Sequence, residues 1–204
     1  MHLVFPSAEW QLECVLTETS GSMRAAVICH PHPLYGGNMN NPVVRAVEDG
    51  LQAAGYSTLR FNFRGTGEST GSYTGGPGEC DDLRAAVACM IDKIGVGKVA
   101  VAGYSFGAMV TLQAGPSVPT VSHLIAVAPP LSFFKLRDLK LDAVPKLFIV
   151  GDRDQYCDAV ELVEQLSSVP EPKKSVVFGG ADHFLFGYES AIGAAVAEFA
   201  ADGL

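Results

Sequence analysis

Short apolar runs alternate with segments of helical periodicity along almost the whole chain. The segments that predict strands are Gln11–Glu18, Ala25–Cys29, Ser57–Phe63, Lys98–Ala102, His123–Ala128, Lys146–Val150 and Ser175–Phe178. The segments that predict helices are Val43–Ala54, Glu79–Ile94, Ser105–Ala114, Ala159–Ser167 and Ser190–Ala201. Gln11–Glu18 alternates polar and apolar residues as a half-buried antiparallel strand does, whereas continuous apolar runs are typical of strands covered on both faces. The pattern therefore predicts an α/β fold with a doubly wound, mostly parallel sheet and helices on both faces.

No internal repeat, low-complexity tract or linker divides the chain, so residues 1–204 are predicted to form a single domain. Loops that follow the strands of such a sheet gather at one edge, and ligands bind there. The loops expected at that edge are His30–Asn41, Arg64–Gly78, Gly103–Gly107, Gly151–Asp158 and Gly179–Gly187.

The charge balance excludes several classes of partner. Against 14 basic residues stand 22 acidic ones, which gives a net charge of -8. Such a surface repels nucleic acid and anionic membranes, so we expect neither as a partner and expect a small molecule instead. No apolar run is long enough to span a bilayer, and the N-terminus lacks a secretion signal. The five cysteines are scattered without a C-x-x-C pair, so we predict a reduced, cytoplasmic protein without a zinc site.

Gly103–Gly107 matches the pattern G-x-S-x-G, with Ser105 at its centre. A serine on a sharp turn between a strand and a helix is held in a strained backbone conformation that exposes its hydroxyl. The residues two before and two after the serine must be very small, because strand and helix pass close together there. The pattern lies between a predicted strand and a predicted helix, and it predicts a nucleophile elbow with Ser105 as nucleophile.

A serine nucleophile needs a general base, usually a histidine that a carboxylate orients. In proteins with this elbow the order along the chain is serine, acid, histidine. His2, His30, His32 and His123 all precede the loop expected to carry the acid. His183 follows the last predicted strand and is therefore the predicted base.

The acid is expected in the loop that follows Lys146–Val150, which contains Asp152, Asp154 and Asp158. Asp154 lies further toward the tip of this loop than Asp152, and we favour it as the carboxylate that meets His183. Asp152 stays open as the alternative acid. The aspartate that is not the acid is expected to bond the backbone of its own turn.

These residues resemble the α/β-hydrolase superfamily over nearly the whole chain, from about Arg24 onward. More narrowly, His30–Asn41 (HPHPLYGGNMNN) and Arg60–Gly67 (RFNFRGTG) are similar to a compact, lidless bacterial subgroup that is described as dienelactone-hydrolase-like. The resemblance implies an α/β-hydrolase fold without a cap domain and a triad of Ser105, Asp154 and His183. Many members carry Val-Pro soon after the acid, where this chain has Gln155–Asp158.

The resemblance also implies that the loop after His30 supplies one backbone N–H of an oxyanion hole, and that Phe106 supplies the other. Pro31 and Pro33 have no N–H group, so the donor in the first loop is either His32 or Leu34.

Three weaker patterns favour structural roles. His30 and His32 flank a proline, but their possible co-ligands are remote, so we expect them to order the loop and predict no metal site. The run Gly65–Gly71 lacks the lysine of a phosphate-binding loop. Arg64 is predicted to tie loops together and not to bind an anion.

The apolar residues between Pro130 and Val144 admit two interpretations. They either line an acyl or aryl pocket, or they form a short helix that packs on the core. The residues concerned are Phe133, Phe134, Leu136 and Leu139.

The predicted function is hydrolysis of small carboxylic esters through an acyl-enzyme, without a cofactor. Thioester or amide cleavage and acyl transfer on the same triad stay open. So does a non-catalytic binding module of the same fold, because fold alone does not fix function. The pattern leaves the natural substrate and the oligomeric state undetermined.

Overall fold

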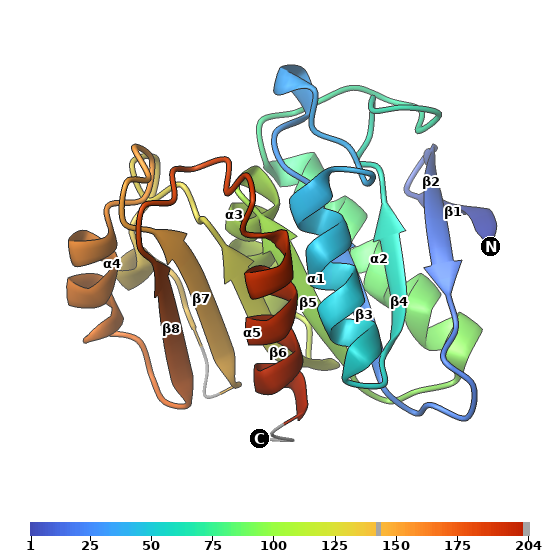
Figure 1. Ribbon diagram of the computed structural model, residues 1–204. Coiled ribbons are helices and arrows are strands. Elements are labelled where there is room, and N and C mark those ends of the chain that lie inside the picture. The colour runs from blue at the N-terminus through green and yellow to red at the C-terminus, as the bar shows by residue number, and fades with distance from the viewer. Residues whose placement is uncertain (142–143, 202–204) are drawn as a thin grey trace.

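The computed structural model describes residues 1–141 and 144–201, and an eight-stranded sheet runs through its centre (Figure 1). The strands lie in the order β1-β2-β4-β3-β5-β6-β7-β8. Their bounds are β1 His2–Ser7, β2 Trp10–Thr17, β3 Ala25–Cys29, β4 Ser57–Phe61, β5 Val99–Tyr104, β6 Val121–Val127, β7 Lys146–Gly151 and β8 Lys173–Phe178. Strands β1 and β2 pair antiparallel, and so do β2 and β4; every other neighbouring pair is parallel.

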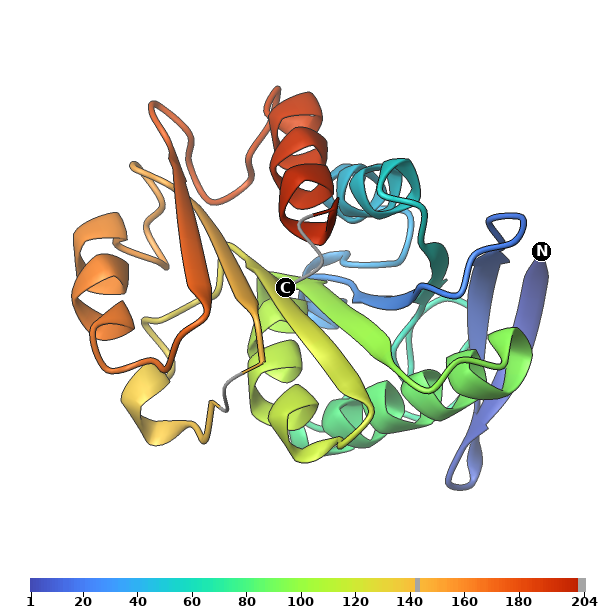
Figure 2. The ribbon, with the colours of Figure 1, turned by 90° about the horizontal axis from the view of Figure 1, so that it is seen from below.

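Helices cover both faces of this sheet (Figure 2). Their bounds are α1 Pro42–Ala53, α2 Pro77–Ile94, α3 Phe106–Ala114, α4 Ala159–Leu166 and α5 Glu189–Ala201. Helices α1 and α5 lie side by side on one face, and α2 and α3 lie on the other. The predicted fold class is therefore confirmed.

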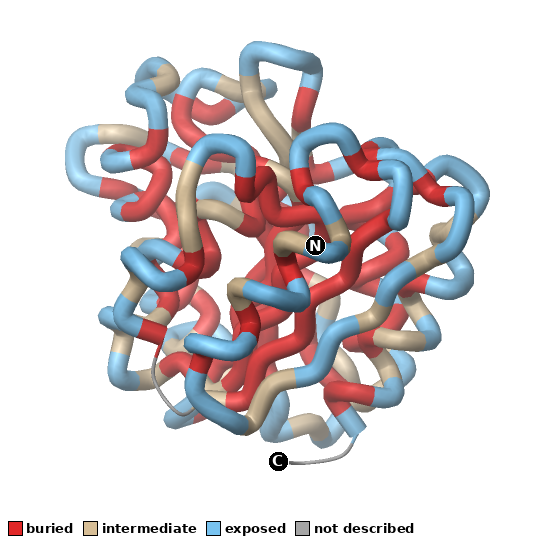
Figure 3. Tube along the Cα trace, turned by 90° about the vertical axis from the view of Figure 1, so that its left-hand side faces the viewer, coloured by how far each residue is buried: buried red, intermediate tan, exposed pale blue. Residues whose placement is uncertain are grey.

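Successive strand residues point to opposite faces of the sheet and thus enter two separate cores. In β3, Ala26 and Ile28 pack with α1 and α5, whereas Val27 and Cys29 pack with α2 and α3. All five residues of β3 are buried, and the exposed residues gather in the surrounding loops and outer helix faces (Figure 3). Because both faces are covered, the parallel strands carry continuous apolar runs and no alternation.

The sequence patterns located most elements to within about two residues at each end, but they missed β1. This strand is an edge strand that pairs with β2 alone and contains Pro6. Proline is tolerated at a sheet edge, where its missing N–H costs no ladder bond, but in a sequence pattern it argues against a strand.

Loops that follow the parallel strands gather at the upper edge of the sheet in Figure 1. The loops after β7 and β8 lie there beside each other, and the loop after β3 rises from the same edge further toward the side of β1 and β2. No helix within residues 1–141 and 144–201 is long and apolar enough to cross a membrane.

Candidate active site

Ser105 lies between the last residue of β5 and the first residue of α3, as the sequence pattern predicts. Its backbone is in the left-handed region, with φ 54° and ψ −118°. A non-glycine residue is strained in this conformation, which persists only where the surrounding structure enforces it. Here the Ser105 N–H donates to the carbonyl of Val127 in β6 at 2.9 Å, which anchors the turn to the sheet.

The two glycines of the pattern are required by close backbone contacts. A Cβ atom on Gly103 would lie 2.2 Å from the carbonyl oxygen of Gly107. A Cβ atom on Gly107 would lie 2.5 Å from the carbonyl oxygens of Cys29 and His30. Strand, turn and helix are therefore packed too tightly for any side chain at either position.

His183, in the loop after β8, connects Ser105 to Asp154. Its Nε2 lies 2.9 Å from Ser105 Oγ, and its Nδ1 lies 2.9 Å from each carboxylate oxygen of Asp154. An ionised carboxylate only accepts hydrogen bonds, so Nδ1 carries the hydrogen and Nε2 is left as an acceptor. The Ser105 hydroxyl thus donates to Nε2, which is the arrangement that a base needs in order to take the serine proton.

Asp154 has a buried side chain in the loop after β7. Its Oδ1 also accepts the N–H groups of Tyr156 at 2.8 Å and Cys157 at 3.0 Å. These backbone donors fix the carboxylate in the orientation that receives His183 Nδ1.

The other two aspartates of this loop have different partners. Asp152 is exposed, and its Oδ1 accepts the Gly180 N–H at 2.7 Å. Asp158 caps α4 by accepting the Glu161 N–H at 2.8 Å. Of the three aspartates, Asp154 is the one whose carboxylate contacts His183.

Two tyrosines hold His183 in place, and the sequence patterns did not single out either of them. Tyr104 donates its hydroxyl to the His183 carbonyl at 3.0 Å, and burial raises the pKa of this phenol, which keeps the donor protonated. The Tyr156 ring meets the His183 ring edge to face, with centroids 4.8 Å apart. Tyr104 occupies a variable position of G-x-S-x-G, and a local pattern does not say where such a side chain is directed.

His32 and Leu34, the two alternatives for the oxyanion-hole donor in the loop after β3, have different surroundings. This loop contains a 3-10 turn, Pro33–Tyr35, which His32 caps. The Leu34 N–H donates to His32 Nδ1 at 3.2 Å, so the loop itself occupies that donor. The centroids of the His32 and Phe106 rings are 5.2 Å apart, so this loop packs against the start of α3. Phe106 is the first residue of α3, so its N–H has no acceptor within the helix.

His30 is buried and bonded to backbone groups on both sides. Its Nε2 accepts the Phe63 N–H at 3.0 Å, and its Nδ1 lies 2.6 Å from the Pro31 carbonyl. Burial lowers the pKa of His30 from 6.5 to about 4, so the ring is neutral at ordinary pH. The predicted loop-ordering role of His30 is confirmed. Over residues 1–141 and 144–201, the structure brings together no group of three histidine, cysteine or acidic side chains that could hold a metal ion.

Arg64 forms a buried salt bridge with Asp82 of α2, in which Nη2 and Oδ1 are 2.7 Å apart. Its Nε also lies 3.0 Å from Oδ2 of the same carboxylate. The prediction of a structural tie is confirmed, although the partner is a helix and not a second loop.

The sequence predicts that the connection after β6 either lines a pocket or forms a short helix on the core, and the structure shows parts of both. Leu136 begins a 3-10 turn, Leu136–Asp138, and is buried in the core. Phe133 is exposed and stacks on Tyr156, which itself contacts His183. This connection therefore contributes Leu131, Leu136 and Leu141 to the core, with Phe134 and Leu139 packed against it, and Phe133 to the surroundings of His183. Residues 142–143 lie outside the described part of the chain.

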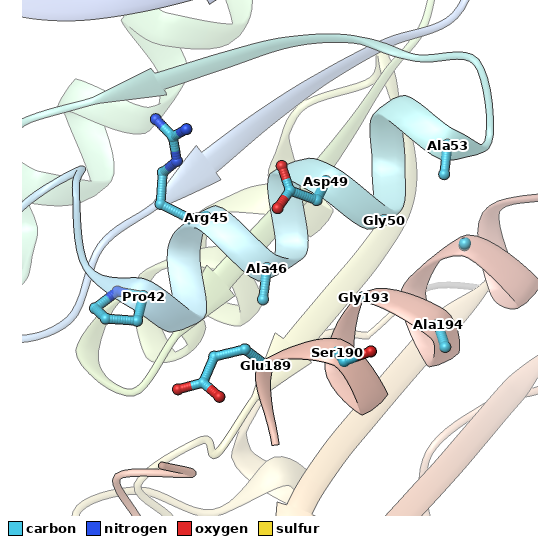
Figure 4. Close-up of a pocket in the computed structure, with 11 residues that line it drawn as sticks. Pro42, Arg45, Ala46, Asp49, Gly50, Ala53, Glu189, Ser190, Gly193 and Ala194 are labelled. Carbon is cyan, nitrogen blue, oxygen red and sulfur yellow. The ribbon is translucent and has the colours of Figure 1, made fainter. Parts of the chain in front are cut away.

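A groove of about 580 Å³ lies between α1 and α5 (Figure 4). The two helices approach closely there, since a Cβ atom on Gly50 would lie 2.4 Å from the Gly193 carbonyl oxygen. Neither Ser105, His183 nor Asp154 lines this groove. The Ser105, His183 and Asp154 side chains therefore lie away from this groove.

Comparison with known proteins agrees with this geometry. Residues 27–147 match the family model described as alpha/beta hydrolase fold. An uncharacterized protein of Rickettsia prowazekii is 35% identical over 175 residues, which cover 81% of this chain and 74% of the relative. The structure is similar to that of an alpha-beta serine hydrolase homologue from Coxiella burnetii, with a TM-score of 0.90, 32% identity and coverage of 97% and 96%. It is also similar to a serine hydrolase without lid from Xanthomonas campestris, with a TM-score of 0.88, 29% identity and coverage of 100% and 94%.

Proposed function

The chain belongs to the alpha/beta hydrolase fold family, and on this premise we propose that it is a serine hydrolase that cleaves small carboxylic esters through an acyl-enzyme. One observation carries the proposal. The Ser105 hydroxyl donates to an imidazole whose other nitrogen is held by a buried carboxylate, with 2.9 Å between the heavy atoms at each step. This combination activates a hydroxyl for attack on a carbonyl.

The proposed first half-reaction acylates Ser105. Ser105 Oγ attacks the ester carbonyl carbon while its proton passes to His183 Nε2, and the carbonyl oxygen becomes an oxyanion. Asp154 stabilises the imidazolium that forms. The C–O bond to the alcohol then breaks, and the departing oxygen takes the proton from Nε2. In the second half-reaction a water molecule gives a proton to Nε2 and attacks the acyl carbon. The bond between that carbon and Ser105 Oγ then breaks, Oγ takes the proton from Nε2, and the acid is released. These steps require no cofactor.

The oxyanion is proposed to bind the N–H groups of Phe106 and His32. Phe106 supports this role because its N–H points out of the start of α3, where the helix dipole favours negative charge. His32 is favoured over Leu34 because the Leu34 N–H is bound by the His32 side chain within the loop. The His32 imidazole also lies 3.0 Å from the Tyr73 hydroxyl, which fixes the loop against the segment before α2.

The proposal is tested with a fluorophosphonate probe and an ester screen. The probe should label the protein at Ser105, and Ser105→Ala should remain unlabelled. Loss of the nucleophile should lower kcat on the best ester by on the order of 10⁶. Because alanine occupies less space than serine, the variant should keep its far-ultraviolet spectrum.

Other outcomes would identify other functions. A non-catalytic module of this fold would neither label nor turn over. Preference for thioesters, amides or an acceptor alcohol in the screen would change the reaction and keep the site. Turnover by Ser105→Ala close to that of the wild type, with contaminating esterases excluded, would overturn the proposal.

A further inference from the structure

The exposed aromatic residues of this protein are concentrated at one edge. Within residues 1–141 and 144–201, every aromatic residue among the large hydrophobic residues that are clearly exposed lies in a loop after β3, β6, β7 or β8. They are Tyr35, Phe133, Tyr156, Phe184 and Phe186. Exposed rings that gather around a site, and are not scattered over the surface, mark a surface that binds something.

Two of these rings, Tyr156 and Phe184, lie against His183, and Phe133 and Phe186 stack on them; we term the four rings the aromatic wall. They make two stacked pairs, Phe133 on Tyr156 and Phe184 on Phe186, each with ring centroids 6.2 Å apart. The Tyr156 centroid lies 4.8 Å from that of His183, and the Phe184 centroid lies 6.0 Å from it.

The aromatic wall is open to solvent although it lies next to a buried histidine. Phe133 is 71% exposed, Phe184 51% and Phe186 74%, whereas His183 is 6% exposed. Rings in this position gain free energy when another aromatic ring covers them, through both the buried area and the ring-to-ring geometry.

The chemistry of the proposed reaction says which half of an ester meets the aromatic wall. The departing oxygen takes its proton from His183 Nε2, so the alcohol half of the ester must begin beside the His183 ring. The carbonyl oxygen points toward the N–H of Phe106, and the acyl chain leaves the carbonyl carbon in a third direction. The alcohol half therefore lies closest to Tyr156 and Phe184.

We propose that the aromatic wall binds the alcohol half of the substrate, and that this alcohol is aromatic. The proposal rests on the function proposed above and names the substrate class of the same site. Phe133, Tyr156, Phe184 and Phe186 determine specificity in it.

Benzyl acetate and methyl phenylacetate test this directly, because they are isomers that carry the same ring on opposite sides of the ester bond. Their alcohols are similar in acidity, and the rate of alkaline hydrolysis of each ester corrects for its intrinsic reactivity. The corrected kcat/KM should favour benzyl acetate by about 3- to 10-fold, the range that an aromatic pair contributes.

Phe133→Leu and Phe184→Leu keep an apolar side chain and remove the ring. Each should lower the preference for benzyl acetate by about 2- to 5-fold, mainly through a higher KM for that ester. Tyr35→Leu is the matched control, because Tyr35 is also an exposed ring but contacts His32 in the loop after β3 and not the aromatic wall. It should leave the preference unchanged.

The outcomes separate this inference from the proposed function. A corrected preference for methyl phenylacetate would place the ring on the acyl side and overturn the inference, while the esterase function would stand. Equal rates, or a preference that survives both leucine variants, would overturn it as well. Failure to cleave either ester, together with no labelling of Ser105, would overturn both proposals.

Discussion

Two histidines at the same edge of the sheet differ in what holds their rings. His183, in the loop after β8, lies between the Asp154 carboxylate and the Ser105 hydroxyl. His30, at the end of β3, lies between the Pro31 carbonyl and the Phe63 N–H. The imidazole is the same, but the partners of His30 are backbone groups that cannot exchange a proton in the reaction. The comparison shows that partners, and not residue type, decide whether a histidine can act as a base.

The surroundings of the two histidines differ in the same sense. Near His30, the salt bridge between Arg64 and Asp82 fixes the glycine-rich segment to α2. Near His183, the aromatic wall is exposed to solvent. The surroundings of His30 are therefore held by a buried salt bridge, whereas the surroundings of His183 are open to a substrate.

Among the changes that test the difference between the two histidines, the largest effect should come from removing the carboxylate that contacts His183. Asp154→Asn should lower kcat by roughly 10⁴, because an amide can hold the imidazole in the wrong tautomer and cannot stabilise the imidazolium. Steady-state kinetics on the best ester measure this change.

Asp152→Asn is the matched control, two residues away in the same loop. Its carboxylate accepts the Gly180 N–H, and an amide oxygen can accept the same bond. The variant should keep kcat within about threefold of wild type, since one surface hydrogen bond is weakly perturbed. If Asp152→Asn were the crippled variant, Asp154 would not be the acid.

A change in pH should reveal His30 through stability. The pKa of His30 is about 4 in the folded protein and 6.5 in the unfolded chain. Between pH 4 and pH 6.5 His30 is therefore protonated in the unfolded chain but not in the folded protein. The contribution of His30 to stability is thus complete above pH 6.5 and is lost as the pH falls toward 4. The shift corresponds to about 3 kcal/mol.

Urea denaturation of the wild type and of His30→Asn at several pH values measures this effect. The variant should be less stable at neutral pH, because it loses two buried hydrogen bonds. Its free energy of unfolding should also fall less steeply than that of the wild type between pH 6.5 and 4. If the free energy of unfolding of the two proteins fell equally steeply with pH, the His30 ring would not be held in its unprotonated form by the fold.

The smallest effect concerns the length of the acyl chain. Each methylene contributes up to about 0.8 kcal/mol only where it is buried. The connection after β6 carries one short 3-10 turn in its described residues, and the exposed side chains of the loop after β3 include Leu34 and Tyr35. Nitrophenyl acetate and butyrate should therefore be cleaved better than palmitate, without a jump in rate above the solubility limit. A preference for palmitate would require an acyl tunnel and would contradict the open site.

Local rules were sufficient for much of this protein. Continuous apolar runs between helical segments determine the parallel sheet, because both faces of each strand must be covered. The glycines around Ser105 determine the turn, because their Cβ atoms would collide with backbone. The order of serine, acid loop and histidine follows from the order of strands at one edge. None of these features depends on where a distant side chain points.

The tertiary structure distinguished residues that the sequence patterns could not tell apart. Asp152 and Asp154 have the same side chain on the same loop, and the fold distinguishes them because Asp154 meets His183 whereas Asp152 meets the Gly180 N–H. His32 and Leu34 both carry an N–H, and the fold distinguishes them because the His32 ring accepts the one from Leu34. The sequence patterns could not reveal that Tyr104 and Tyr156 support His183, because these contacts join residues far apart in the chain. A sequence determines which groups a loop contains, but only the packing of loops against each other determines which groups meet.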